Sequence, residues 1–266
     1  MKFFSLLLAA CLPGLVYSQT VTPGTQDSSL TTHKVSVSRG VDPPKIRSFI
    51  IPAVFITYGL ISLGDNAVRR LDFTTRNTIV NDHPNFKTSA DNYLQFAPGA
   101  AYYGLALIGI KGKHNIADAT ALFVISEGIM GVSTYGVKKW VGRRRPDGSN
   151  DASFPSGHTA NAFAEAEFLN QEYRDVSPWI GYAGYTIATA TGVLRLYNDK
   201  HFVSDVVAGA GFGIASTKIA YLIYPHLKKL VLGKNTTMKY SFAPMYQQID
   251  PLSQQRAAGL SLNGTF

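Results

Sequence analysis

Two histidines, His158 and His201, are the residues of this chain best suited to carry out chemistry. His201 stands four residues before Asp205, which places both on one face of a helix that opens at Phe202. The carboxylate can then accept a hydrogen bond from one ring nitrogen, which fixes the tautomer and leaves the other nitrogen free as a base or nucleophile. His201 and Asp205 are therefore a candidate reactive pair.

The other histidine ends the sequence Pro155-Ser156-Gly157-His158, which precedes an alanine-rich stretch of helical character. Glycine lets the backbone come close to a ligand, and the free amides at the start of a helix attract anions. Ser156 adds a hydroxyl group. His158 would stand beside this anion site, where it could give a proton to a departing alkoxide.

Basic residues supply the charge that an anion would need. Lys138 and Arg145 are seven residues apart, which on a helix puts them on one face, and Pro146 then ends that helix. Arg195 precedes His201 by six residues and could reach the same pocket. A guanidinium beside an ammonium suits the equatorial oxygens of a phosphoryl group in transfer, so the sequence predicts phosphoryl transfer without a metal.

Each segment alone also has a structural explanation. A basic run at a helix end is commonly a solvated edge, a Ser-Gly-His sequence commonly caps a helix, and a His-Asp pair can be an ordinary salt bridge at a helix start. All three segments occur in one chain, and each points to anion binding or proton transfer. Their combination favours a shared catalytic function.

The residues between these segments predict helices that position them. Apolar stretches are separated by helix punctuation such as Gly64-Asp65 and Ser177-Pro178, and no strand-like alternation competes with them. The predicted helices are 49–64, 93–110, 116–137, 159–169, 178–196 and 202–224. The predicted fold is therefore all-α, a single bundle of about six helices.

Both ends of the chain differ from this body. Residues 1–18 are predicted to be a secretory signal, with a basic start and an apolar run, although Leu8-Ala9-Ala10-Cys11 also resembles a lipoprotein box. Residues 19–46 are predicted to form a flexible leader, 47–232 the helical domain and 233–266 a tail. The tail alternates apolar and polar residues in two runs, which predicts a short β-hairpin.

The composition favours a membrane or a lipid headgroup over nucleic acid as the partner. Of the 266 residues, 45% are hydrophobic and 16% charged, and the net charge of +8 includes cation clusters at Lys138–Arg145 and Lys228-Lys229. Several predicted helices are shorter than the ~20 apolar residues of a membrane crossing or carry charges. We therefore expect some helices to be buried in protein or to lie at the membrane interface.

The three segments together resemble the type 2 phosphatidic acid phosphatase (PAP2) superfamily, whose pattern is K-x6-R-P, P-S-G-H and S-R-x5-H-x3-D. The matching residues are Lys138 to Pro146 for the first part, Pro155 to His158 for the second, and Arg195, His201 and Asp205 for the third. Leu194 stands where the family has a serine. The resemblance covers roughly residues 90–225 and implies a helical fold of the PAP2 and haloperoxidase type.

By this resemblance, His201 attacks phosphorus to form a phosphohistidine, Asp205 orients it, and His158 protonates the leaving oxygen and later helps to activate water. The implied phosphate-binding residues are Lys138, Arg145, Ser156, Gly157 and Arg195. No metal or other cofactor is implied. Arg143 and Arg144 lie outside the matched positions, and we expect them to shape the rim of the site.

The expected function is that of a metal-independent phosphatase acting on a phosphomonoester or diphosphate of a membrane lipid: lipid A, undecaprenyl diphosphate, phosphatidic acid or phosphatidylglycerol phosphate. The expected location is the bacterial cell envelope, at the inner membrane with the site facing the periplasm, and no obligate protein partner is evident. The alternatives are a secreted acid phosphatase for small phosphoesters, a vanadium haloperoxidase with a similar pocket, and a non-catalytic membrane protein. The last would require damage to one histidine, and both are present.

Overall fold

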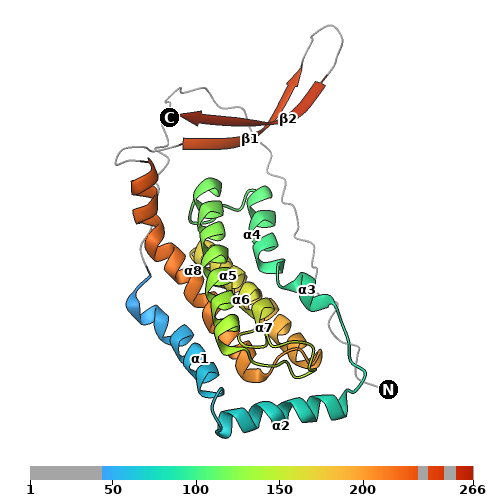
Figure 1. The fold of residues 1–266 in the computed structure, drawn as a ribbon. Coiled ribbons are helices and arrows are strands. Elements are labelled where there is room, and N and C mark those ends of the chain that lie inside the picture. Colours follow the sequence, from blue (N-terminus) through green and yellow to red (C-terminus); the bar gives the residue numbers. More distant parts are fainter. Residues whose placement is uncertain (1–43, 233–238, 249–255, 266) are drawn as a thin grey trace. The chain divides into compact units, whose positions relative to one another are not determined.

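Helices make up most of the described chain. The computed structural model describes residues 44–232, 239–248 and 256–265 (Figure 1), so the predicted signal and most of the predicted leader lie outside the described residues. Within these ranges the chain forms eight α-helices, preceded by a 3-10 helix at Ile46–Phe49. The α-helices are α1 (Ile50–Ile61), α2 (Ala67–Asp82), α3 (Ala90–Leu94), α4 (Ala97–Leu107), α5 (Ile116–Val141), α6 (Gly157–Tyr173), α7 (Pro178–Tyr197) and α8 (Val203–Leu232).

The predicted all-α body is confirmed, but its first part contains more helices than expected. Helix α2 had no predicted counterpart because it is polar and lacks a long apolar stretch. It begins after Asn66, whose side-chain oxygen accepts hydrogen bonds from the N–H groups of Val68 and Arg69 at 3.0 and 3.1 Å. The predicted helix 93–110 is two helices, α3 and α4, and Pro98 lies in the first turn of α4.

Helix α6 is the most enclosed helix and packs against α5, α7 and α8 (Figure 1). Its contact with α8 is close because small residues line it: a methyl group on Gly213 would collide with the carbonyl oxygen of Ala160. At the start of the two helices, the N–H of Ser156 donates to the carbonyl oxygen of Asp205 at 2.9 Å. The packing of α6 on α8 therefore brings two of the chemically suited segments together.

A cluster of aromatic and aliphatic side chains joins α4, α5, α6 and α8. Its buried members are Tyr102, Ala119, Leu122, Phe168, Leu169, Tyr173, Tyr221 and Tyr224. The rings of Tyr102 and Phe168 meet edge to face, with their centroids 4.7 Å apart. Burial of such large apolar side chains is the main favourable contribution to folding, so this cluster is the principal core of the helical body.

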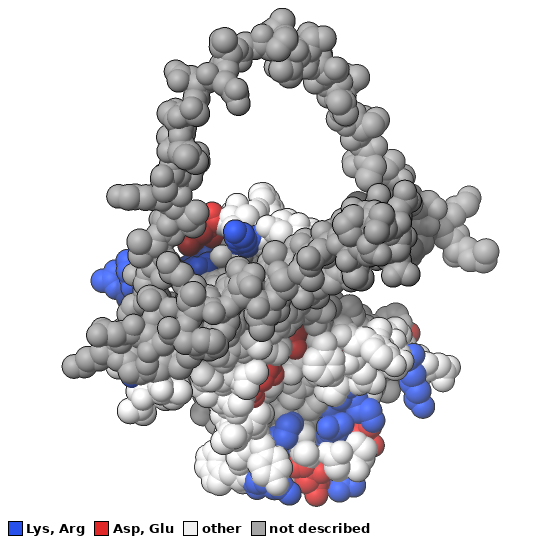
Figure 2. Space-filling view, turned by 90° about the horizontal axis from the view of Figure 1, so that it is seen from above, with Lys and Arg blue, Asp and Glu red and all other residues white. Residues whose placement is uncertain are grey.

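Among the described residues, two helices are long and apolar enough to cross a membrane, by length and composition: α5 and α8. Most of the apolar window of α8 is buried, as in a core helix, whereas only 22% of that of α5 is buried. The outward face of α5 exposes Val132, Tyr135 and Trp140. On the face shown in Figure 2, charged residues of both signs gather near one edge, and much of the other described surface in view is uncharged.

The tail forms two strands, β1 (Lys239–Gln248) and β2 (Arg256–Thr265), which pair antiparallel. Lys239 is opposite Thr265, and Gln248 is opposite Arg256. The alternation of apolar and polar residues predicted this hairpin.

Candidate active site

Lys138 lies in the last turn of α5 and is fixed against the loop that leads into α6. Its ammonium group donates to the carbonyl oxygen of Ala152 at 2.9 Å and to that of Pro155. Gly142 then adopts a left-handed backbone with φ of 59° and ends the helix. Arg145 therefore lies in the loop, and the prediction that it shares a helix face with Lys138 is wrong.

Arg145 and Arg195 carry guanidinium groups with unused donors. Arg195 lies in the last turn of α7, is only 6% exposed and forms an ion pair with Asp91. The Nε atoms of both arginines are buried without a hydrogen-bond partner in the part of the chain that the structure describes. Burial and the charge of Arg195 lower the pKa of Arg145. A bound anion would satisfy these donors and offset this repulsion.

The first turn of α6 supplies amides and a hydroxyl group. Ser156 precedes the helix as its N-cap and Gly157 is its first residue. The N–H of Ser156 already donates to Asp205, so the amides left for a ligand are those of the helix itself. The Ser156 hydroxyl accepts a hydrogen bond from Thr159 at 2.9 Å, which leaves its own proton to donate.

His158 stands in the first turn of α6, with Nε2 2.9 Å from the side-chain oxygen of Asn92. Burial is the largest cause that lowers the pKa of His158, to about 4, and the positive charge of Arg195 is the next largest. The imidazole is therefore neutral at pH 7, and its Nε2 proton is donated to Asn92. A dianion bound among the arginines would favour the protonated form, which is the form that a general acid needs.

His201 is almost completely buried, and it precedes α8 rather than lying on it. Its Nδ1 is 3.7 Å from Oδ2 of Asp205, which is longer than a hydrogen bond, and has no other partner among the described residues. The two residues do not share a helix face as predicted, but the turn into α8 brings them together. Burial lowers the pKa of His201 to about 4, so the ring is neutral at pH 7.

Asp205 is held by hydrogen bonds on both of its oxygens. Oδ2 accepts from the Ser153 hydroxyl and from the N–H of Phe202, while Oδ1 accepts from Arg143 at 2.8 Å. The prediction that Arg143 lies at the rim is therefore wrong, because its side chain is 11% exposed and pairs with a buried carboxylate. The Arg144 side chain is 69% exposed, as expected for a rim residue.

Sequence reasoning missed two residues of the site, both on the short helix α3. Asp91 is buried and accepts hydrogen bonds from Arg195 and from Asn198. Asn92 contacts His158. The only available signal was a polar Asp-Asn pair directly before the apolar stretch that starts at Tyr93, and a pair of this kind is common at ordinary helix starts.

The predicted residues from three separate segments act on one another through their charges. Lys138, Arg145 and Arg195 each lower the pKa of His158, and Lys138 and Arg195 also lower that of His201. In the ranges that the structure covers, His, Cys, Asp and Glu side chains do not converge in a group of three or more that could hold a metal ion. What the arrangement offers is positive charge and donors for an oxyanion, next to two imidazoles.

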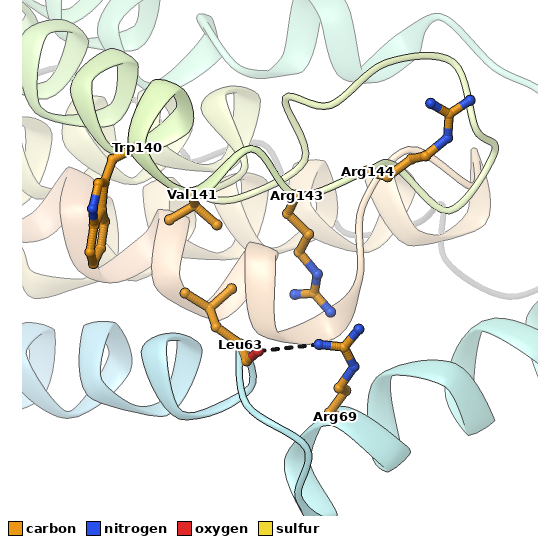
Figure 3. Close-up of a pocket in the computed structure, with 6 residues that line it drawn as sticks. All are labelled: Leu63, Arg69, Trp140, Val141, Arg143 and Arg144. Carbon is orange, nitrogen blue, oxygen red and sulfur yellow. Dashed lines mark hydrogen bonds between the residues drawn. The ribbon is translucent and has the colours of Figure 1, made fainter.

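A pocket next to these residues shares only Arg143 with the network around Asp205 (Figure 3). Its lining residues are Leu63, Arg69, Trp140, Val141, Arg143 and Arg144. Arg69 and Arg143 point into the same space, and Arg144 extends away from it along the loop. Neither histidine lines this pocket. The candidate site for chemistry is therefore not this pocket but the group of residues around the two histidines.

Comparison with known proteins identifies relatives with named activities. Residues 116–229 match the model of the PAP2 superfamily. The chain is 35% identical over 242 residues to a lipid A 1-phosphatase of Porphyromonas gingivalis, and this alignment covers 82% of this chain and 51% of that protein. It is 32% identical over 94 residues to phosphatidylglycerophosphatase B of Bacillus subtilis, and this alignment covers 29% of this chain and 44% of that protein.

The chain spans about half the length of the curated relatives it matches. Among solved structures, it is similar to the transmembrane PAP2 type phosphatidylglycerolphosphate phosphatase from Bacillus subtilis, with a TM-score of 0.43 and 21% sequence identity. That similarity covers 68% of this chain and 97% of the other.

Proposed function

The chain belongs to the PAP2 superfamily, and on this premise we propose that it is a phosphatase that works through a phosphohistidine at His201. One observation carries the proposal: the buried Nε donors of Arg145 and Arg195 have no partner within the described residues, while the charges of both arginines act on the neutral His158 and that of Arg195 also acts on the neutral His201. A site with spare positive charge and a neutral imidazole suits an oxyanion that is to be attacked.

In the first step, the free nitrogen of His201 attacks phosphorus. The new P–N bond forms as the P–O bond to the leaving group breaks, and His158 gives its proton to the departing oxygen. Asp205 holds the His201 ring and stabilises the charge that the ring gains. The 3.7 Å gap between Nδ1 and Oδ2 has to close for this, as catalytic hydrogen bonds commonly do when substrate binds.

In the second step, water attacks the phosphohistidine. His158, now neutral, takes a proton from the water as its oxygen bonds to phosphorus and the P–N bond breaks. Inorganic phosphate leaves, and His201 returns to its starting form. Because one imidazole serves as the acid in the first step and as the base in the second, a metal-bound water is not needed for this scheme.

The cations and the α6 amides would hold the three equatorial oxygens of the transferring group. Lys138, Arg145 and Arg195 supply charge, and Ser156 and Gly157 supply the first turn of α6. Charges fixed in advance in a water-poor site stabilise a phosphoryl transition state strongly. The ion pair of Arg195 with Asp91 and the carbonyl contacts of Lys138 keep these groups in place before substrate arrives.

We further propose that the substrate is a membrane lipid: lipid A, undecaprenyl diphosphate, phosphatidic acid or phosphatidylglycerol phosphate. Two observations support this choice: the apolar outward face of α5, and two relatives whose names refer to lipid phosphates. The proposed location is the bacterial cell envelope, at the inner membrane with the site facing the periplasm.

The test uses the purified full chain in detergent and a panel of the four lipid classes together with a small soluble phosphoester. We expect phosphate release from at least one lipid at a higher kcat/KM than from the soluble ester. His201→Ala should reduce that rate to background, whereas Arg174→Ala should leave it unchanged, because Arg174 is an exposed residue at the end of α6. Equal hydrolysis by His201→Ala would rule out the mechanism, and a preference for the soluble ester would favour the secreted acid phosphatase.

A further inference from the structure

The carboxylate of Asp205 is fixed by Arg143, which occupies a variable position of the first motif. Nη1 of Arg143 donates to Oδ1 of Asp205 at 2.8 Å, and the backbone carbonyl of Arg143 accepts from the N–H of Ser153 at 2.9 Å. Ser153 in turn donates its hydroxyl to Oδ2 of Asp205. One arginine therefore controls both oxygens of the carboxylate, directly through its side chain and indirectly through Ser153.

Arg143 is itself held in a single orientation. Its guanidinium lies over the ring of Phe202, 4.2 Å from the ring centroid, and Phe202 packs edge to face on Phe73 of α2. Figure 3 shows the Arg143 side chain extending from its loop toward α2. A planar guanidinium stacked on an aromatic ring keeps its fork of donors aimed in one direction.

Asp72 on α2 takes the second donor of this fork. Its Oδ2 accepts from Nη2 of Arg143 at 2.8 Å. Its Oδ1 accepts from the N–H of Ser204 at 2.9 Å, and the Ser204 hydroxyl also donates to Asp72. Ser204 lies in the first turn of α8, so Asp72 joins α2 to the helix start that carries Asp205. The Asp72 side chain is completely buried.

We propose that Asp72 and Arg143 are positioning residues that hold Asp205 in the orientation needed to support His201. This inference rests on the proposed function, and it adds α2 to the catalytic apparatus. The two carboxylates share one guanidinium, so the buried group keeps a net negative charge beside His201. With both fork donors occupied, Arg143 approaches Asp205 only at Oδ1 and leaves Oδ2 turned toward the imidazole.

The sharpest test compares Arg143 with an arginine that lies outside the site. Arg143→Gln should lower kcat on the preferred phosphoester by ~10- to 100-fold, the range found when a residue that orients a metal ligand is lost, with KM changed less than kcat. Arg143→Lys, which keeps the charge without the fork, should recover part of the loss. Arg174→Gln should match the parent, because Arg174 is an exposed residue at the end of α6, away from the residues of the site.

A readout independent of activity separates positioning from stability. The pKa of His201, followed by NMR in protein with labelled histidine, should rise in Arg143→Gln because a positive charge is lost. It should fall in Asp72→Asn because a negative charge is lost. The other charged groups that act on His201 are Asp205, Arg195 and Lys138, and all remain in these variants. Because loss of a charge can shift this pKa by itself, Arg143→Lys is the deciding variant. It keeps the charge, so the pKa of His201 should differ from the parent value only if the fork orients Asp205, whereas a purely structural role would leave that pKa unmoved in folded Arg143→Lys.

The double variant Asp72→Asn with Arg143→Gln keeps the test informative if a single variant fails to fold, because it leaves no unpaired buried charge at these two positions. We expect it to fold, to show the kcat loss of Arg143→Gln, and to keep the KM of the parent within a few fold. Parent-like kcat in the folded double variant would overturn the proposal. If the parent hydrolyses none of the phosphoesters, the proposed function fails, while the NMR comparison still tests the positioning of Asp205.

Discussion

His158 and His201 are both neutral at pH 7, yet the proposed chemistry requires them in opposite protonation states. His201 needs a free lone pair to attack phosphorus, and burial provides this by holding its pKa at about 4. His158 needs a proton, and its pKa is also about 4. Substrate binding can produce this difference in protonation state, because a phosphate dianion among Lys138, Arg145 and Arg195 offsets the charges that disfavour protonation of His158.

Asn92→Asp tests the role of His158 as an acid. The new carboxylate would lie where the Asn92 oxygen now stands, 2.9 Å from Nε2, and should raise the pKa of His158 by about 1 unit or more. The fall in kcat on the alkaline side should move to higher pH by the same amount, as measured in a pH–rate profile. Asn92→Ala, which adds no charge, should not produce this upward shift. An alkaline limb that stays in place in Asn92→Asp would contradict the acid role.

The low pKa values also predict acid sensitivity. The folded pKa of each histidine, about 4, lies below the unfolded value of about 6.5, so the unfolded chain binds more protons between these two pH values. The free energy of unfolding should therefore fall as the pH drops from 6.5 to 4, by at most ~1.4 kcal/mol per pH unit for each histidine. Denaturant titrations at several pH values measure this slope. His201→Gln should have a shallower slope than the parent, and an equal slope would count against a buried neutral His201.

At the scale of elements, α3 and α2 act on the site without carrying any of its motif residues. Asp91 and Asn92 come from α3, and Asp72 comes from α2. The motif residues could be predicted because phosphoryl chemistry needs rare combinations such as Ser-Gly-His. The supporting residues could not, because a single Asp or Asn on a polar helix has many ordinary roles, and only the tertiary fold shows what it contacts.

The local backbone geometry at the motif residues also could not be predicted from their spacing. The spacing of Lys138 and Arg145 suggested one helix face, but Gly142 ends α5 between them. The spacing of His201 and Asp205 suggested the same, but α8 starts two residues after His201. In both cases a turn brings the two residues together, so the residues named from the sequence lie near one another by a local geometry that their spacing did not predict.

The contact of α6 with α8 should tolerate little added volume. Gly213→Ala places a methyl group against the Ala160 carbonyl, and we expect it to destabilise the fold by ~1–3 kcal/mol. The matched control is Gly128→Ala on α5, where a methyl group meets nothing within 4 Å; it should be neutral or stabilising by up to ~1 kcal/mol. Thermal or denaturant unfolding of both variants measures the difference, and equal stability would mean that the two helices are not packed this closely.

At the scale of the whole molecule, the exposed apolar side chains of α5 predict membrane association. Val132, Tyr135 and Trp140 are 76%, 64% and 77% exposed, and aromatic residues of this kind are favoured at membrane interfaces. We expect the full chain to stay in the membrane fraction after a carbonate wash and to be released by detergent. Complete release by carbonate would instead favour a secreted enzyme for small phosphoesters.

The proposed mechanism requires a covalent bond between His201 and phosphorus. The most direct measurement is to mix the purified chain with a lipid substrate labelled at its phosphate, quench within the first turnover under alkaline denaturing conditions, and locate the label by peptide mass spectrometry. We predict phosphohistidine at residue 201 in the parent, and its accumulation in His158→Ala whenever attack by water is slowed more than its formation. Label on any other residue, or phosphate release from lipid by His201→Ala at the parent rate, would rule out this mechanism.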